Sequence, residues 1–404
     1  MSSSSWTVQL DDAAGLHQAA DRADAYEALL HSILQHEVAS SLPSAIHKYL
    51  QAAALDKRNA AGAGLLVGRR VVKHMITNII DASIRPDHPL HDTTCFQAVL
   101  AQILTSCASS SVYDDELVPA RLALANAYER QHAYAQAAQT LQSISPDAAQ
   151  HATETSWAAL CVHSLRLFWL AQDLPAADQA LRRANSAIHS VRDDINLVHT
   201  YKLYQAHTYA AQQRYMEAAS RFYDLALSSD DAHAQRAALC AMLATPSIQR
   251  TELLTKCHAW PSSHSWPFHT ALEKAMHSRL WTSEDQASLV PFLTIYDHML
   301  VHHDVEAWKW AIAMHNIFAA SRTFTSIPFQ RLATLAGVDI TACVKILAQL
   351  RLQNQLSTNC TIDQRTQGVY FTSSLAASER LKRSDARIGA ALQALDTAHS
   401  RLST

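Results

Sequence analysis

Apolar and polar residues alternate at helical spacing along most of the chain. In Tyr26–Leu34 and Ala45–Leu50 the apolar positions recur every three or four residues, which predicts amphipathic helices in the N-terminal region. The same pattern predicts further helices over about 93–106, 271–281 and 304–321. The chain is therefore expected to be mainly helical.

Prolines and small polar residues mark breaks between these helices. Pro86–Pro89 and Ser109–Ser111 interrupt the pattern, and Asp114-Asp115 follows the second break. Pro119 suits the first turn of a helix, where its missing N–H costs nothing, so we predict a helix start there. The stretch 246–270 contains three prolines and is less regular.

A fourteen-residue pattern occurs three times, starting at Tyr128, Phe168 and Tyr209, which lie 40 and 41 residues apart. Each copy has large apolar residues at offsets 0, 6 and 13 and Ala at offset 9. Small Ala side chains let two helices approach while the large residues fill the seam. The spacing predicts helix pairs stacked into a right-handed α-solenoid of TPR- or HEAT-like repeats. Chance alignment in an Ala-rich chain is the alternative.

The pattern changes near Thr323. A short strand, two helices and two more strands follow, with Gly337 between the helices and Gly368 in the last turn. This order predicts a winged helix. Its expected elements are the strand Thr325–Ile327, the helices Pro328–Ala336 and Thr341–Gln353, and the strands Leu356–Ile362 and Val369–Phe371.

A terminal helix is predicted over Glu379–Leu402. Its apolar positions are spaced by seven, four, three, four and three residues, which is an a/d stripe typical of a helix that packs on other helices. An isolated winged helix would leave this stripe little to pack on. The stripe consists of Leu381, Ile388, Leu392, Leu395, His399 and Leu402.

Glycine is rare and unevenly placed. The 404 residues include only 7 Gly, and none lies between Gly68 and Gly337. Tight hairpins and many strand–helix turns use the positive φ that Gly adopts most easily. The middle of the chain is therefore not expected to be a sandwich, a barrel or a Rossmann sheet. We expect helices joined by short, mostly right-handed turns, in an all-α fold with a small α/β part.

Charge and cysteine content indicate which partners and which cellular environment to expect. The formal net charge of -3 provides no global attraction for nucleic acid or anionic lipid. The 7 Cys are scattered, as expected for reduced thiols of an intracellular protein. The first residues lack the pattern of a secretory signal, and no apolar run of membrane-spanning length occurs.

The sequence contains no complete motif for catalysis, metal binding or cofactor binding. His298 and His302 have the spacing of zinc ligands, but Met299 stands where the general base of a metalloprotease would be. Gly62–Gly68 resembles a dinucleotide loop with one spacing too long and no preceding strand, so a helix–helix connection is favoured. Cys343 and Cys360 have no nearby His and are expected to be inert thiols. We therefore expect no catalytic residues, no metal and no cofactor.

The predicted winged helix raises the question of nucleic-acid binding. Its second helix, Thr341–Gln353, carries only Lys345 and Arg351 among many apolar residues. A helix that enters the major groove needs more basic and amide side chains on its outer face. Arg380–Arg383 is more basic but resembles a solvated helix face. Docking to protein is therefore favoured, with nucleic-acid binding kept as an alternative.

The order of helical repeats, winged helix and terminal helix resembles the PCI domain. This family occurs in the proteasome lid, the COP-nine signalosome and a translation initiation factor complex, and the likeness is greatest to the signalosome branch. The lid branch shares the architecture and is the main alternative. The resemblance rests on Tyr128–Arg130, Ala137-Ala138, Tyr215–Phe222, Leu272–Met276, Met314–Arg322, Phe329–Leu335, Ile362–Gln364 and Gly368–Phe371.

The resemblance implies a non-catalytic scaffold and substrate-sensing subunit. The signalosome removes the ubiquitin-like modifier NEDD from the cullins of cullin-RING ubiquitin ligases (deneddylation), and its zinc lies in another, metalloprotease-like subunit. The implied partners are other PCI-domain and metalloprotease-like subunits and, through the N-terminal arm, a cullin-RING ligase. Neither nucleic acid nor membrane is expected as a partner, and the expected location is the cytoplasm and nucleus.

The resemblance also implies interfaces and domains. Winged helices of the family pair edge to edge and their terminal helices gather in a bundle. The expected domains are 1–115 (N-terminal helical repeats), 116–322 (TPR-like repeats, with the helical part of the PCI domain from about 200), 323–372 (winged helix) and 373–404 (C-terminal helix). The candidate interface residues are Val369, Tyr370, Phe371, Leu381, Ile388, Leu392, Leu395 and Leu402.

Overall fold

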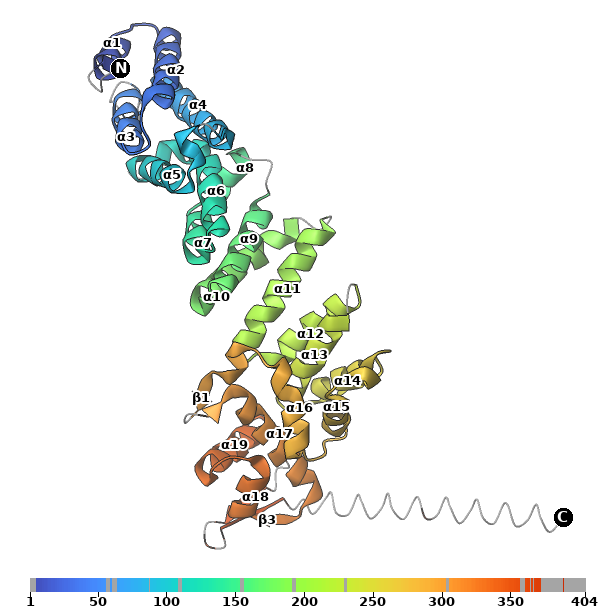
Figure 1. Cartoon of the computed structure of the whole chain (residues 1–404). Helices are drawn as coiled ribbons and strands as arrows, with labels where there is room; N and C mark the ends of the chain where they lie inside the picture. The colour runs from blue at the N-terminus through green and yellow to red at the C-terminus, as the bar shows by residue number, and fades with distance from the viewer. Residues whose placement is uncertain are drawn as a thin grey trace, which may run out of the picture. The chain divides into compact units, whose positions relative to one another are not determined.

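The computed structural model divides the chain into two compact units, Met1–Tyr204 and Gln205–Thr404, which we describe separately. Figure 1 shows the helices and strands of both units. The structure describes residues 5–55, 59, 64–86, 88–107, 111–152, 156–190, 194–228, 231–302, 305–356, 360–363, 365, 367–371 and 388. No single helix among these residues is both long and apolar enough to span a membrane; only α18 and α19 pass that test together, across an 86° bend.

The first unit is built from α-helices that pack on α-helices one or two places away in sequence. A continuous apolar core runs from α1 to α6 around buried residues such as Tyr26, Tyr49 and Met75. Beyond it, α7 packs between α6 and α9, and α9 packs on α10. The elements are α1 (Ser5–Ala14), α2 (Ala19–His36), α3 (Leu42–Ala53), α4 (Leu65–Ile84), η2 (Pro89–His91), α5 (Thr93–Cys107), η3 (Ser111–Tyr113), α6 (Asp114–Arg130), α7 (Tyr134–Gln142), α8 (Pro146–Ala152), α9 (Trp157–Leu170), α10 (Leu174–Ala187), η4 (Ile188–Ser190) and α11 (Ile195–Ala211), which continues into the second unit.

The helix start predicted at Pro119 is wrong. Helix α6 begins at Asp114, and Pro119 lies inside it. Asp114, Asp115 and Glu116 fill its first turn, where negative side chains are stabilised by the partial positive charge of the helix N-terminus. The acidic run therefore determines the start more strongly than the proline does.

The three sequence repeats have one conformation in common. Ala137, Ala177 and Ala218, at offset 9, are fully buried between paired helices, as predicted. The residue at offset 4 is left-handed in every copy, with φ of 60° at His132, 60° at Gln172 and 62° at Gln213. The prediction of mostly right-handed turns is therefore wrong at the repeats.

These left-handed residues belong to a Schellman motif that ends the first helix of each pair. The N–H at offset 5 donates to the carbonyl at offset 0, over 3.0 Å from Ala133 to Tyr128 and 3.2 Å from Asp173 to Phe168. The N–H of Gln172 donates to Trp169 O over 3.0 Å. A non-glycine residue loses roughly 1–2 kcal/mol in this conformation, and the two hydrogen bonds offset that cost.

The second unit combines helical layers with the winged helix. Helix α12 packs on α13, α13 on α14, and α17 on both winged-helix helices. The hairpin β1–β2 precedes α17, so the helix predicted over 304–321 begins only at Ala307. The elements are α12 (Tyr215–Ala226), α13 (Asp231–Leu243), α14 (Ile248–His258), η5 (Ser263–Ser265), α15 (His269–Met276), α16 (Ser283–Leu289), η6 (Val290–Phe292), η7 (Ile295–His298), β1 (Leu300–His302), β2 (Val305–Glu306), α17 (Ala307–Thr323), β3 (Ser326–Pro328), α18 (Phe329–Ala336), α19 (Ile340–Leu352), β4 (Thr361–Asp363) and β5 (Gly368–Tyr370).

The winged helix is confirmed. Its three strands form an antiparallel sheet in the order β3-β5-β4, with Ile327, Val369 and Ile362 aligned across it. Gly337 ends α18 with φ of 71°, in the turn predicted for it. Gly368 is already the first residue of β5, so its predicted place in the turn is wrong; Gln367, with φ of 47°, takes the left-handed conformation instead.

Gly68 is required for close packing rather than for a phosphate loop. It lies within α4, where an added Cβ would sit 2.5 Å from Tyr113 Oη and 2.9 Å from the carbonyl oxygen of Asn59. The hydroxyl of Tyr113 in turn donates to Ala54 O over 2.7 Å. The part of Gly62–Gly68 that the structure describes is thus a site of helix contact.

We expect Gly68→Ala to destabilise the protein by about 1–3 kcal/mol, because overpacking outweighs the better helix propensity of Ala. Denaturant-induced unfolding measures the change. In a Tyr113→Phe background, which lacks the clashing hydroxyl, the same substitution should cost less; an equal loss in both backgrounds would contradict this account.

We expect Gln172→Gly to stabilise the protein by up to about 1 kcal/mol, because Gly adopts the left-handed conformation without strain. The control is Gln179→Gly on the exposed side of α10, which should cost about 1 kcal/mol. Thermal unfolding measures the change in stability of both variants. A change of the same sign in both would refute the assignment of strain to Gln172.

Candidate protein-binding surfaces

The segment Met314–Arg322 carries two buried polar side chains that join the helical layers to the winged helix. His315 and Asn316 on α17 are 0% and 1% exposed. Buried polar groups need hydrogen-bond partners, so their contacts identify their roles. His315 Nε2 donates to Arg279 O over 2.9 Å, and its Nδ1 accepts from the Arg250 guanidinium over 3.2 Å. Because a guanidinium only donates, the imidazole is neutral.

Asn316 links α17 to two other segments. Its Oδ1 accepts from the backbone N–H of Trp281 over 3.0 Å, and its Nδ2 donates to Leu335 O in α18 over 3.0 Å. The indole of Trp281 also packs against the imidazole of His315, with ring centroids 4.2 Å apart. Helix α17 therefore fixes where the winged helix lies within the second unit.

Arg250 is a buried cation at the end of a helix. Its Nε donates to Ala241 O over 2.9 Å and its Nη2 to Met242 O over 2.8 Å. These carbonyls belong to the last turn of α13, which lacks intrahelical partners and carries partial negative charge. Burial lowers the pKa of Arg250 to about 10, so the group stays charged near neutral pH. It forms no ion pair with any described residue.

A second buried polar group holds the segment before α17. Asp297, 0% exposed, accepts from Tyr215 Oη over 3.0 Å and from the N–H and Oγ1 of Thr294 over 2.7 Å each. Arg236 adds a contact of 3.4 Å. Burial, followed by the charge of Asp297, raises the pKa of Tyr215. Tyr215 occupies offset 6 of the third repeat, so the repeat itself anchors this segment.

The sheet determines which wing residues can meet a partner. Val369 is fully buried and Phe371 is 7% exposed, and both pack in the core of the winged helix, while Tyr370 is half-buried. Strand β5 is the central strand, so both of its edges are already paired. Of the two outer strands, β3 ends in Pro328, which has no N–H to donate, whereas β4 exposes Thr361 and Ile362. An added strand would therefore fit the outer edge of β4.

The candidate residues of the terminal stripe lie mostly outside the described residues. This applies to Leu381, Leu392, Leu395 and Leu402. Ile388 is described, and its side chain is 57% exposed. Their role in an interface stays a prediction.

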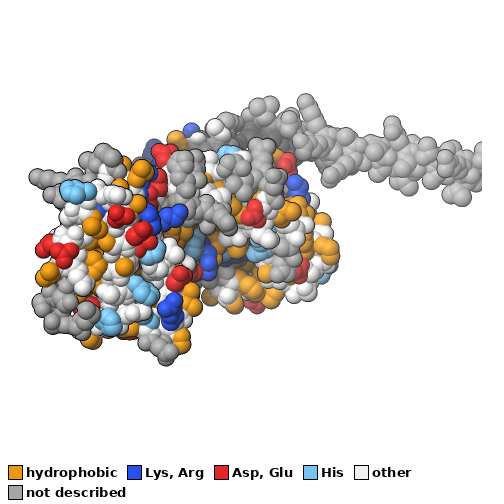
Figure 2. Space-filling model, turned by 90° about the horizontal axis from the view of Figure 1, so that it is seen from above, with side chains coloured by type: hydrophobic (Ala, Val, Ile, Leu, Met, Phe, Trp, Pro, Cys, Tyr) orange, Lys and Arg blue, Asp and Glu red, His pale blue; other side chains and the backbone are white. Residues whose placement is uncertain are grey.

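Basic side chains of the described residues do not gather into a large patch on the face that Figure 2 shows. On the face shown in Figure 2, acidic and basic side chains are interspersed among hydrophobic and His side chains. On α19 the exposed positions include Ile340 and Leu352, which are 48% and 84% exposed, together with the cations Lys345 and Arg351. A mixed outer face with two cations suits contact with protein better than contact with phosphate.

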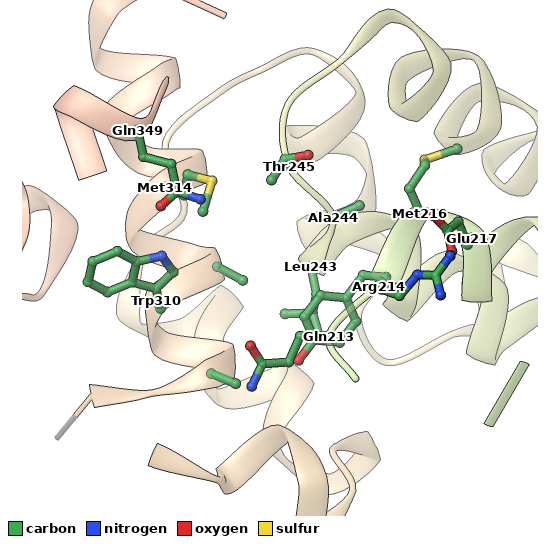
Figure 3. A pocket seen from close by; sticks show the side chains of 13 residues that line it. Gln213, Arg214, Met216, Glu217, Leu243, Ala244, Thr245, Trp310, Met314 and Gln349 are labelled. Atoms are coloured by element: carbon green, nitrogen blue, oxygen red, sulfur yellow. The ribbon is translucent and has the colours of Figure 1, made fainter. Parts of the chain in front are cut away.

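A crevice of about 230 Å³ lies between α12, the end of α13 and α17. In Figure 3, Trp310 and Met314 lie across it from Leu243 and Gln213, and Gln349 of α19 lies beside Met314. Arg214 and Glu217 at its rim are ion-paired with each other. The lining residues contain no pairing of a nucleophile with a base, so the crevice can receive an apolar side chain but has no catalytic groups.

The thiols and histidines of the described residues do not form a reactive centre. All seven Cys are buried, and burial raises the pKa of Cys107, Cys161 and Cys240 to about 11 and of Cys257 and Cys343 to about 12. Such thiols are poor nucleophiles. No group of three or more His, Cys, Asp or Glu side chains among the described residues could hold a metal ion.

Acid should destabilise the second unit through its buried histidines. Burial lowers the pKa of His315 to about 3 and of His207 to about 4, so the folded state favours the neutral rings. Their contribution is complete above the unfolded pKa near 6.5 and is lost as pH falls below it. Each ring should cost about 1.4 kcal/mol per pH unit in that range.

Thermal unfolding between pH 7.5 and 5 tests this expectation. His315→Gln should lower the melting temperature at pH 7.5 but weaken its fall with acid, whereas His189→Gln, at an exposed position, should change neither. An unchanged acid dependence in His315→Gln would contradict the assignment.

Comparison with known proteins identifies relatives of the chain. Residues 34–231 match the family model described as PSMD12/CSN4, N-terminal. The chain is 27% identical to COP9 signalosome complex subunit 4 of Caenorhabditis elegans, over 71% of this chain and 72% of that protein. It is 26% identical to the subunit 4 of Emericella nidulans, over 75% and 77%, and 24% identical to that of Arabidopsis thaliana, over 74% and 77%.

The family model covers residues 34–231, which include the three sequence repeats, and the winged helix has the PCI-type order of elements. The chain is thus similar to COP9 signalosome subunit 4 proteins, and residues 34–231 match the N-terminal model that this subunit shares with PSMD12.

Proposed function

We propose that the chain is a non-catalytic subunit of a signalosome-type complex that removes NEDD from cullins. The observation that carries this proposal is the similarity to subunit 4 proteins over about three quarters of the chain in fungi and plants. Burial also raises the pKa of the thiols, which makes them poor nucleophiles. Catalysis would then lie on another, metalloprotease-like subunit.

The chain offers two ways to join such a complex. The outer edge of β4, with exposed Thr361 and Ile362, can pair with a strand of another winged helix. The stripe that includes Ile388, Leu392 and Leu395 can enter a helical bundle. In this proposal the N-terminal arm senses the cullin-RING ligase, and the protein works in the cytoplasm and nucleus.

The terminal stripe gives the sharpest test. The double variant Leu392→Asp and Leu395→Asp should reduce co-purified partner subunits at least about tenfold, because charges on a bundle seam are costly to bury. The matched double variant Gln393→Asp and Thr397→Asp, which places the same charges off the stripe, should keep them. Equal recovery from both variants would overturn the role of the stripe.

A proteasome-lid subunit is the second candidate, because the matched family model covers PSMD12 as well as CSN4. Mass spectrometry of the proteins recovered with the unmodified chain separates the two: signalosome subunits support our proposal, and lid subunits favour the alternative. A winged-helix nucleic-acid binder, the third, would bind DNA with a steep salt dependence. Absence of binding at low salt would exclude it.

A further inference from the structure

The first unit contains a larger cavity than the crevice of the second. Its volume is about 550 Å³, and it lies between the C-terminal ends of α4 and α6 and the segment formed by η2 and the start of α5. We call it the α4–α6 groove. Its apolar lining includes Ile80, Ile84 and Phe96, and its polar lining includes His91, Asn126 and Arg130.

The apolar side of the groove is partly open to water. Ile84, the last residue of α4, is 72% exposed, while Phe96 below it is 8% exposed. Ile80 is half-buried. A bulky apolar side chain placed here would cover Ile84 and contact Ile80 and Phe96 at once, which is favourable because it removes apolar surface from water.

The polar side of the groove carries an exposed cation. Arg130 is exposed and forms no ion pair with any described residue. Its neighbour Glu129, in contrast, pairs with His163 over 2.9 Å and with Arg166 over 3.3 Å. None of the residues that line the groove is Asp or Glu.

The charges near the groove leave Arg130 available. Asp92 immediately precedes α5. Its carboxylate accepts hydrogen bonds from Thr94 N over 3.2 Å and from Thr94 Oγ1 over 2.6 Å, so it already has partners. His91 Nδ1 lies 3.2 Å from Ser83 O. Arginine binds carboxylates with paired, charge-assisted hydrogen bonds, and the exposed amide of Asn126 can bond a peptide backbone.

We propose that the α4–α6 groove binds a segment of a partner protein in which a bulky apolar residue stands next to an acidic one. The apolar residue lies against Ile84 and Phe96, and the carboxylate pairs with Arg130. A single cation above an apolar floor fits such a peptide better than a phosphate backbone, which needs several cations. The function proposed above gives the N-terminal arm a sensing role without a binding site. This inference adds a defined groove and a peptide chemistry in the first unit, and it does not depend on the winged helix or the terminal stripe.

Fluorescence anisotropy with the full chain tests the proposal. The probe is a labelled Ser-Asp-Leu-Phe-Asp-Ser peptide at low salt. Arg130→Gln and Ile84→Ser should each weaken binding at least about fivefold, because they remove the ion pair and the apolar contact respectively. Lys48→Gln, an equal charge change at an exposed position of α3 outside the groove, should leave binding unchanged. A Ser-Asn-Leu-Phe-Asn-Ser probe should also bind about fivefold more weakly.

Several results would overturn the proposal. These are no binding up to about 1 mM peptide, equal affinity of Arg130→Gln and the unmodified chain, or an equal loss in Lys48→Gln, which would indicate general charge attraction. A single-stranded oligonucleotide that binds more tightly and loses binding in Arg130→Gln would also overturn it, in favour of nucleic acid. Circular dichroism of each variant confirms that it is folded. Recovery of partner subunits, which tests the proposed function, is measured separately, so either idea can fail without the other.

Discussion

The second unit depends on a buried positive charge that has no negative partner among the described residues. Arg250 lies among the carbonyls that end α13 and beside the neutral ring of His315, so the helix terminus and an imidazole replace a carboxylate. A charge in a low-dielectric interior is tolerated only where its donors are bonded. His315 also donates a hydrogen bond to Arg279 O, and the adjacent Asn316 donates one to Leu335 O in α18. The same network therefore fixes the position of the winged helix within the second unit. The exposed edge of β4 in the winged helix is therefore positioned by a polar network that includes Arg250, which lies far from it in sequence.

Much of this fold could be predicted from sequence because it is periodic. The Ala at offset 9 of each repeat is buried where the pattern indicates, and Gly337 forms the turn between the two winged-helix helices. Predictions from single residue types were wrong where two local preferences competed. Three acidic residues begin α6 before Pro119, and exposed His132 and Gln172 adopt a conformation that scarcity of Gly argues against. Charge in the first turn decides the start of α6, and backbone hydrogen bonds of the Schellman motif decide the repeat turns. Neither appears as hydrophobic spacing in the sequence.

The candidate surfaces were harder to predict for a related reason. An apolar strand residue such as Val369 has the same sequence signature whether it fills its own core or faces a partner. Strand order distinguishes the two, because it places β5 in the centre of the sheet and β4 at an edge. The His315-Asn316 pair belongs to the segment Met314–Arg322 that resembles the PCI family, but its structural role depends on Arg250 and Trp281, which are distant in sequence. The groove beside Arg130 likewise combines segments from three parts of the first unit.

The burial of the thiols has a consequence for the lifetime of the protein. Cys95, Cys107 and Cys161 lie inside the first unit, and Cys240, Cys257, Cys343 and Cys360 lie inside the second. An oxidant reaches a thiolate only after the surrounding helices separate, so local opening must precede chemical damage. The rate of irreversible oxidation is then reduced in proportion to the fraction of time for which the surroundings of each thiol are open. The extent of cysteine oxidation in the folded protein would therefore report how often each unit opens locally.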